Sequence, residues 1–127
     1  MKILVDTSVI IDFLRRESPQ NSCFSRLAKD YNLSISLVTV VELYSGRSVR
    51  RKETRERIDK IISAMEIFIP DLGISKEAGL LRSAHDLSLS DAIIASTALS
   101  QKIMLATLDH GDFKNIKGIK LVDLNKS

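Results

Sequence analysis

Near the amino end, residues 2–8 read Lys2-Ile3-Leu4-Val5-Asp6-Thr7-Ser8, a short apolar run that stops at an acid. An apolar run of this length, bounded by polar residues, is typical of a buried strand. The acid and the two hydroxyl residues after it are typical of a helix start, and apolar residues then recur at helical spacing from Val9 to Leu14. The stretch therefore predicts a strand followed directly by a helix, with Asp6 at the turn.

Three later stretches have the composition of short buried strands, and a fourth is a weaker candidate. They are residues 33–36, 66–69 and 103–106, with 120–122 as the weaker one. Helical spacing predicts helices after Asp6 up to the break at Ser18-Pro19, within 19–30, from 39 to 46 and on through a charged stretch to 65, within 75–87, and after 88. Strands separated by helices favour the α/β class, as a three-layer α/β/α fold with a parallel sheet of four or five strands. With no linker or internal repeat, we expect one domain over 1–127.

The composition excludes several classes of protein. A chain of 127 residues with 44% apolar content is long enough for a core. Its apolar runs are far shorter than the roughly 20 residues that span a bilayer, so we expect no membrane association. Asp6 comes too early for the apolar region of a signal peptide, and a single cysteine, Cys23, allows no internal disulfide. We therefore expect a cytoplasmic protein.

Four acids occupy places where such a fold turns a corner. Asp6 and Asp109 each follow an apolar run, whereas Glu42 and Asp91 each come three places after a hydroxyl residue, where a helix is expected to begin. An open α/β sheet gathers the carboxyl ends of its strands along one edge, so acids far apart in sequence can meet there. Clustered acids repel one another and need cations, and hard oxygen ligands suit Mg²⁺ or Mn²⁺.

Such a cluster has a known chemistry. Two divalent ions roughly 3.5–4 Å apart can clamp the attacking and leaving oxygens of a phosphoryl displacement, and one of them activates the attacking water. We expect the hydroxyls of Thr7, Ser8 and Thr107 to support the acids or a bound water. Asp112 is close enough to Asp109 in sequence to compete for its role.

Each acid also has a purely structural explanation. Asp6 could cap the helix that follows it. Glu42 and Asp91 fit the third position of a capping box, where an acid stabilises a helix by roughly 0.3–1 kcal/mol. Asp109 could cap the loop toward Phe113. For any single acid the capping role is the simpler explanation, and the joint placement of all four is what favours a metal site; the two roles are compatible.

The net charge of +3 is unevenly distributed. Residues 47–60, the basic segment, hold seven basic and three acidic residues. A basic segment beside an acidic site suits a polyanion held by its backbone, and the alternative is a solvated helix face with the pairs Glu53–Arg57 and Glu56–Lys60. With 5% aromatic residues and no Trp, a stacking platform for bases is not expected. The predicted contacts with RNA or a partner are Arg47, Arg50, Arg51, Lys52 and Arg55.

Four motifs, in order along nearly the whole chain, resemble the PIN domain and in particular the VapC-type toxins of toxin–antitoxin pairs. They are Ile3-Leu4-Val5-Asp6-Thr7-Ser8, Thr39-Val40-Val41-Glu42-Leu43, Leu89-Ser90-Asp91-Ala92-Ile93-Ile94-Ala95, and Leu105-Ala106-Thr107-Leu108-Asp109 with Phe113. The resemblance implies a Mg²⁺- or Mn²⁺-dependent endoribonuclease on a parallel sheet. It assigns catalytic and metal-binding roles to Asp6, Glu42, Asp91 and Asp109, with Asp112 as the rival to Asp109. It also implies a homodimer and a small VapB-like antitoxin.

The resulting hypothesis is a metal-dependent endoribonuclease, the toxin of a type II toxin–antitoxin pair, which hydrolyses RNA phosphodiesters with a metal-activated water. Two alternatives stay open. One is a catalytically silent PIN-like module that only binds RNA or a partner. The other is an RNA-processing PIN nuclease that is not a toxin. Metal titration distinguishes the silent module from the enzyme.

Overall fold

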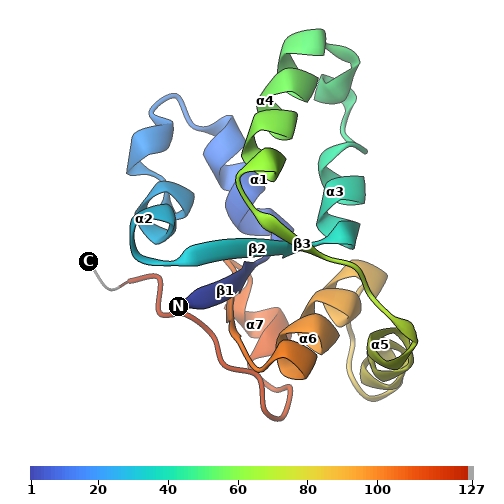
Figure 1. Cartoon of the computed structure of the whole chain (residues 1–127). Coiled ribbons are helices and arrows are strands. Elements are labelled where there is room, and N and C mark those ends of the chain that lie inside the picture. The colour runs from blue at the N-terminus through green and yellow to red at the C-terminus, as the bar shows by residue number, and fades with distance from the viewer. Residues whose placement is uncertain (126–127) are drawn as a thin grey trace.

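The computed structural model describes residues 1–125, and the chain alternates between strands and helices (Figure 1). In chain order the elements are β1 (Lys2–Val5), α1 (Thr7–Arg15), the 3₁₀ helix η1 (Pro19–Asn21), α2 (Cys23–Asp30), β2 (Asn32–Ser36), α3 (Leu37–Leu43), the 3₁₀ helix η2 (Arg47–Arg50), α4 (Lys52–Ser63), β3 (Glu66–Phe68), α5 (Leu72–Ala84), α6 (Leu89–Gln101), β4 (Met104–Ala106) and α7 (His110–Phe113). None of the helices among residues 1–125 has both the length and the apolar character needed to cross a membrane.

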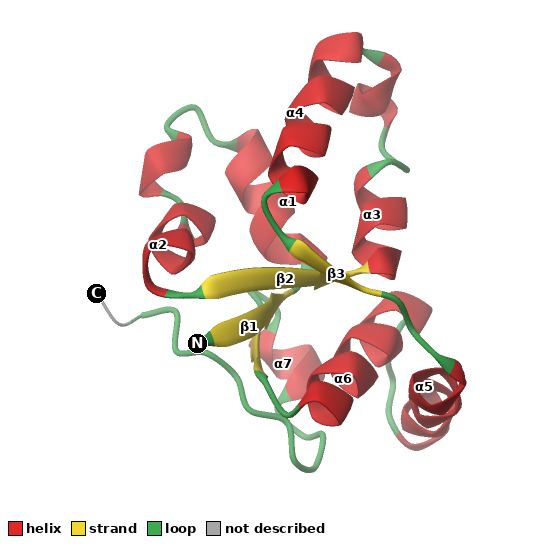
Figure 2. Ribbon diagram, viewed as in Figure 1, coloured by secondary structure: helices red, strands yellow, loops and turns green. Residues whose placement is uncertain are grey.

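The four strands form one sheet in the order β3-β2-β1-β4, and all neighbouring strands are parallel. The sheet lies between two sets of helices, as Figure 2 shows. This confirms the predicted α/β class and the three-layer arrangement. Because the strands are parallel, their carboxyl ends share one edge, where Asp6 follows β1 and Thr107 follows β4.

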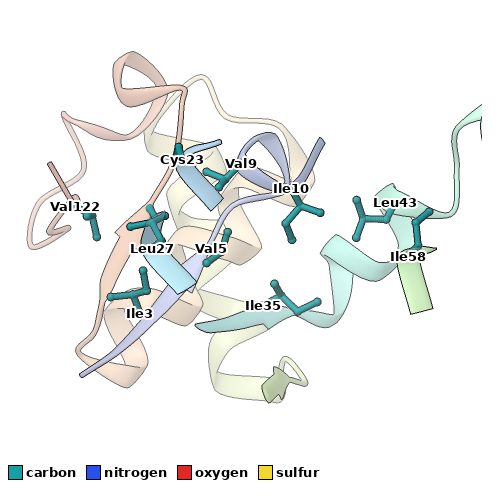
Figure 3. Packing of buried hydrophobic residues seen from close by; sticks show 11 residues of the cluster. Ile3, Val5, Val9, Ile10, Cys23, Leu27, Ile35, Leu43, Ile58 and Val122 are labelled. Atoms are coloured by element: carbon teal, nitrogen blue, oxygen red, sulfur yellow. The ribbon is translucent and has the colours of Figure 1, made fainter. Parts of the chain in front are cut away.

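The central strand β1 sends alternate side chains into two cores. Ile3 and Val5 are fully buried in the core that faces α1, α2 and α4 (Figure 3). Leu4, between them, is buried against α5 and α6 on the opposite face. A strand that is buried on both sides explains why this run reads as continuously apolar rather than alternating. It also makes β1 a rigid support for the residue that follows it.

Two predicted boundaries around the second strand and its helix are wrong. Helix α3 begins at Leu37 rather than Thr39, because the Ser36 side chain caps it by accepting from the Val38 N–H at 3.3 Å. Thr39 is therefore inside the helix. The predicted continuous helix from there to Met65 is also wrong, because α3 ends at Leu43 and the chain continues through η2 before α4 begins.

Two further expectations need correction. Residues 120–122 form no fifth strand, since Leu121 makes only an isolated parallel bridge to Leu105. Helix α5 begins at Leu72 rather than Ser75, because Asp71 caps it by accepting from the Ile74 N–H at 2.8 Å. The strand predicted at 103–106 is present one residue shorter, as β4.

The ion pairs predicted on the charged helix are also wrong. Glu56 pairs with Lys52 at 3.8 Å, one turn before it, rather than with Lys60. Arg57 turns away from Glu53, donates from Nη1 to the Leu14 carbonyl at 3.1 Å and lies over the Phe13 ring. Arg57 thus ties α4 to α1 instead of pairing along its own helix.

Candidate active site

Asp6 is buried at the turn between β1 and α1, with 3% of its surface exposed. The Thr7 N–H donates to its Oδ1 at 2.9 Å, which is the helix-capping contact expected from the sequence. Its Oδ2 accepts from the Ser8 hydroxyl at 2.9 Å and from the Thr107 hydroxyl at 2.7 Å. Burial nevertheless raises the pKa of Asp6 above its usual range, with the nearby charge of Asp109 as a smaller cause. Asp6 therefore accepts three hydrogen bonds but forms no ion pair within the described residues, and capping α1 accounts for only one of these contacts.

The loop after β4 is fastened to Asp6 through two hydroxyls. The Leu108 N–H donates to Ser8 Oγ at 3.1 Å, and the Asp109 N–H donates to Thr107 Oγ1 at 2.9 Å. Both hydroxyls in turn donate hydrogen bonds to Asp6 Oδ2. These two short chains of hydrogen bonds fix the position of the loop that carries Asp109.

Glu42 lies in the last turn of α3 and reaches toward the same edge of the sheet. Its Oε1 accepts from the Thr7 hydroxyl at 2.7 Å, and its Oε2 accepts from the Ser90 hydroxyl at 3.1 Å. An ionised carboxylate can only accept, so the single Thr7 hydroxyl proton is donated to Glu42. The Thr39 hydroxyl, 3.0 Å from Thr7 Oγ1, is then the donor to Thr7. The capping-box explanation for Glu42 is wrong, because α3 begins five residues before it.

Asp91 lies in the first turn of α6, where Ser88 caps the helix and accepts from the Asp91 N–H at 3.1 Å. The capping geometry predicted at this spacing is therefore present. The pKa of the Asp91 carboxyl is raised from 3.8 to about 6, mainly by burial and next by the charge of Asp6. Asp112 and Glu42 raise it further by smaller amounts. The carboxyl thus shares its surroundings with three other acids.

Asp109 and Asp112 both approach the cluster, from different positions. Asp109 precedes α7 and Asp112 lies within it, and both side chains are exposed. Asp109 acts electrostatically on Asp6, whereas Asp112 acts on Asp91. The Asp109 side chain makes no capping hydrogen bond to α7, so its capping explanation is wrong. We call Asp6, Glu42, Asp91, Asp109 and Asp112 the acidic pocket.

The acidic pocket fits a divalent cation by its chemistry. None of the ion pairs between residues of the described chain involves any of the five acids. All its donors are hard carboxylate and hydroxyl oxygens, which suit Mg²⁺ or Mn²⁺. As it stands, no set of three His, Cys, Asp or Glu side chains within residues 1–125 is arranged to hold a metal ion alone. Mg²⁺ does not require one, because it commonly takes one or two carboxylates and keeps waters and substrate phosphate.

The predicted basic contacts are spread over a longer surface. Arg47 lines a groove of about 460 Å³ together with Glu42. Lys52 pairs with Glu56, and Arg55 donates to the Val49 carbonyl at 2.7 Å. Arg50 and Arg51 are exposed. Of the five predicted contacts, only Arg47 lines the groove beside the acidic pocket.

Two polar residues of the pocket, Ser90 and Thr39, were not predicted to support the acids. Ser90 directly precedes Asp91 at the helix start, and Thr39 lies one helical turn before Glu42. Both positions are visible in the sequence. Their contacts with Glu42 and Thr7 depend on how α3, α6 and α1 pack, which spacing along the chain does not give.

Comparison with known proteins agrees with this geometry. The family model described as "PIN domain" matches residues 3–119. This chain belongs to the PIN domain family. The PIN chain is 32% identical over 123 residues to "Ribonuclease VapC10" from Mycobacterium tuberculosis, covering 93% of this chain and 90% of that protein. It is 30% identical over 129 residues to "Ribonuclease VapC1" from Methanocaldococcus jannaschii, covering 96% and 88%.

A solved structure also matches this PIN domain over nearly its full length. The structure titled "Toxin-antitoxin complex from Klebsiella pneumoniae" superposes with a TM-score of 0.76 at 27% identity, covering 98% of this chain and 99% of that one. The predicted resemblance to PIN domains of the VapC type is thereby confirmed.

Proposed function

We propose that this PIN domain is an endoribonuclease of the VapC type, the toxin of a toxin–antitoxin pair, and that it requires Mg²⁺ or Mn²⁺. Residues 1–127 act as one nuclease unit in the cytoplasm. Support comes from the near full-length similarity to proteins named as VapC ribonucleases and to a chain of a toxin–antitoxin complex. The observation that carries the proposal is the buried hydrogen bond from Thr107 to Asp6, a residue 101 positions away, among carboxylates that form no ion pair with a cation within residues 1–125.

In this proposal Asp6, Glu42 and Asp91 hold the metal, and Asp109 or Asp112 completes its surroundings. The bound ions would lower the pKa of a water and stabilise charge on the departing oxygen. The hydroxyls of the chain do the positioning, as Thr107 and Ser8 fix one oxygen of Asp6, and Thr7 and Ser90 each fix one oxygen of Glu42.

Asp91 and the acids around it explain why a cation belongs here. With a pKa near 6, Asp91 is mostly ionised at neutral pH although burial and its neighbours oppose the charge. A divalent cation removes that conflict, and so would a basic side chain from a protein partner. We therefore propose a small VapB-like antitoxin as the silencing partner, RNA as the substrate, and association of the toxin as a homodimer.

Cleavage of a labelled single-stranded RNA by the purified chain, with Mg²⁺, with Mn²⁺ and with EDTA, tests the proposal. We expect Asp6→Asn to lower cleavage more than about 100-fold, since even residues that only orient metal ligands cost 10–100-fold. The matched control is Asp71→Asn, which also replaces a helix-capping Asp. Asn caps helices as well as Asp does, so both variants should fold, and Asp71→Asn should keep full activity.

Two outcomes would overturn the proposal. The first is full cleavage by Asp6→Asn in the presence of Mg²⁺. The second is a wild-type chain that neither cleaves RNA nor binds Mn²⁺ at neutral pH by calorimetry, which would favour the silent binding module.

A further inference from the structure

Arg15 lines two grooves, one of which is also lined by Glu42 and the other by Ser8, whose hydroxyl donates to Asp6. One groove, of about 460 Å³, separates α1 from the region of η2 and α4, and Glu42 and Arg47 are among its lining residues. The other, of about 450 Å³, lies between α1 and the loop after β4, and Ser8 lines it. Ile11 and Arg15 line both grooves. One face of α1 therefore lines both grooves, and the Arg15 guanidinium group lies at the carboxyl-terminal end of that face.

This face of α1 is continuous with the acids. Ser8, Ile11 and Arg15 are three and four residues apart, so they follow one another along a single face of α1. Arg15 lies about 10 Å along the helix axis from Ser8. The Ser8 hydroxyl donates to Asp6. A chain molecule that lies along this face therefore meets Arg15 and then the acidic pocket.

The charge of Arg15 is available to such a molecule, whereas the charge of Arg16 is paired and one nitrogen of Arg57 is already hydrogen-bonded. Arg16 pairs with Asp12 at 2.9 Å, and Arg57 donates to the Leu14 carbonyl. Arg15 is exposed, and neither it nor Arg47 takes part in an ion pair between described residues. The two grooves thus present the guanidinium groups of Arg15 and Arg47, and in the first groove also that of Arg57, which is hydrogen-bonded to a carbonyl, next to the acidic pocket.

We propose that Arg15 and Arg47 bind phosphates of single-stranded RNA next to the one that is cleaved, so that the strand passes from one groove to the other across the acidic pocket. This inference rests on the proposed ribonuclease function and adds Arg15, which the charge pattern alone did not indicate. Phosphate is the appropriate ligand because the planar guanidinium fork binds its oxygens in pairs. Five carboxylates repel a polyanion, so cations close to them are needed for RNA to approach.

RNA binding can be measured separately from cleavage in the Asp6→Asn background. Fluorescence anisotropy of a short fluorescein-labelled single-stranded RNA in EDTA, over a range of salt concentrations, gives the affinity and its salt dependence. Adding Arg15→Gln should weaken binding about tenfold at low salt, the effect of one charged hydrogen bond. It should also make the slope of log affinity against log salt shallower by about 0.7, as expected for one lost phosphate contact on a single strand.

The matched control is Arg26→Gln, which removes the same charge from α2, where Arg26 lines a separate hollow beside Cys23. It should lower affinity only through net charge and leave the salt slope unchanged. In the cleaving chain, Arg15→Gln should raise KM while kcat stays near the wild-type value. Arg15→Lys keeps the charge but loses the planar fork, so its RNA affinity should lie between those of the parent chain and Arg15→Gln. It also serves as the second variant if Arg15→Gln folds poorly.

Equal salt slopes and equal KM values for Arg15→Gln and Arg26→Gln would overturn the proposal, and would assign the grooves to a protein partner instead. A wild-type chain that cleaves no RNA would count against the proposed function. The anisotropy comparison would still decide the role of Arg15, so the two failures are distinguishable.

Discussion

In the acidic pocket Asp6 is 3% exposed, and its two oxygens accept hydrogen bonds from Thr7, Ser8 and Thr107. In the basic segment the cations are exposed, and except for Arg57 their side-chain hydrogen bonds and ion pairs are with residues nearby in the sequence. Lys52 pairs with Glu56 one turn away, and Arg55 donates to the Val49 carbonyl. Asp6 is thus fixed partly by a long-range contact at the sheet edge, whereas among the cations of the basic segment only Arg57, which donates to the Leu14 carbonyl, makes a long-range hydrogen bond or ion pair within the described residues.

Under the proposed function, the difference follows from what each charge has to do. A metal ligand acts within a few tenths of an ångström, so its position must be set by packing and hydrogen bonds. A cation that attracts a polyanion acts over a distance close to the Debye length, about 8 Å at physiological salt. Substitutions of the acids should therefore have large, specific effects on cleavage, and substitutions of the charged side chains in the basic segment should have small effects.

The basic segment has one deep anchor, and removing it should give the largest change in stability. Ile58 of α4 is 2% exposed and packs in the core with Leu43 and Ile10. Ile58→Ala should lower the free energy of unfolding by about 2–5 kcal/mol, because it removes buried methylene groups and leaves a cavity. Urea unfolding measures this. Ile69→Ala, at a position that is 71% exposed, should cost less than about 0.5 kcal/mol.

A small loss of unfolding free energy in Ile58→Ala would contradict the contrast drawn between the basic segment and the acidic pocket. It would mean that α4 is held mainly by Arg57 and its contact with the Leu14 carbonyl, and that the basic segment depends on polar contacts like the acidic pocket.

Thr107 tests the pocket with a change that keeps side-chain size. Thr107→Val removes the hydroxyl that donates to Asp6 and accepts from the Asp109 N–H. Cleavage should fall about 10–100-fold, as for other groups that orient a metal ligand. Thr97→Val is the control, since Thr97 is equally buried but its hydroxyl donates only to the Ile93 carbonyl within α6. Equal activity of the two variants would show that the Asp6 position tolerates loss of the tether.

The sequence predicted which distant residues meet at the sheet edge better than it predicted the local helix caps and ion pairs. Asp6 after a buried run and Thr107 after another placed both at the carboxyl edge of a parallel sheet, and that edge is where they meet. The rule is topological and does not depend on side-chain detail. The same rule indicated that Glu42 and Asp91 would approach Asp6, and the network through Thr7 and Ser90 brings them there.

What the sequence did not predict depends on competition between neighbours. The spacing to Glu42 indicated Thr39 as the cap of α3, but Ser36, three residues earlier, caps it. Glu56 had Lys52 and Lys60 at equal spacing on either side, and it pairs with Lys52. Arg15 has no sequence signal that distinguishes it from Arg16; only the packing of α1 against two grooves does.

Replacing Asp91 should show, through the pH dependence of thermal stability, how much the crowded acids destabilise the metal-free fold. The folded pKa of Asp91, about 6, exceeds the ordinary 3.8, so the folded state holds its proton more tightly than the unfolded state. This favours the folded metal-free protein below about pH 4, and the benefit is lost as pH rises through about 6. Asp91→Asn should therefore raise the thermal midpoint of the metal-free chain at pH 7, and the gain should shrink to nothing toward pH 4.

Differential scanning calorimetry in EDTA at several pH values measures this gain. Asp86→Asn changes the net charge equally at an exposed position outside the pocket and serves as the control. A thermal midpoint for Asp91→Asn that stays below the wild type at pH 7 would mean that Asp91 stabilises the fold as a helix cap more than the pocket destabilises it.

Lys52 should show the smallest effect, and a small effect is informative here. Its ammonium lies 3.8 Å from Glu56, with both side chains more than half exposed, at 77% and 66%. Exposed pairs one turn apart contribute about 0.3–0.5 kcal/mol, so Lys52→Gln should lower the free energy of unfolding by no more than that. The loss should disappear in high salt, because screening already weakens the pair. Glu56→Gln breaks the same pair from the other side and should match it. A loss above about 1 kcal/mol for Lys52→Gln alone would mean that the basic segment is built from specific contacts, and the contrast with the acidic pocket would no longer hold.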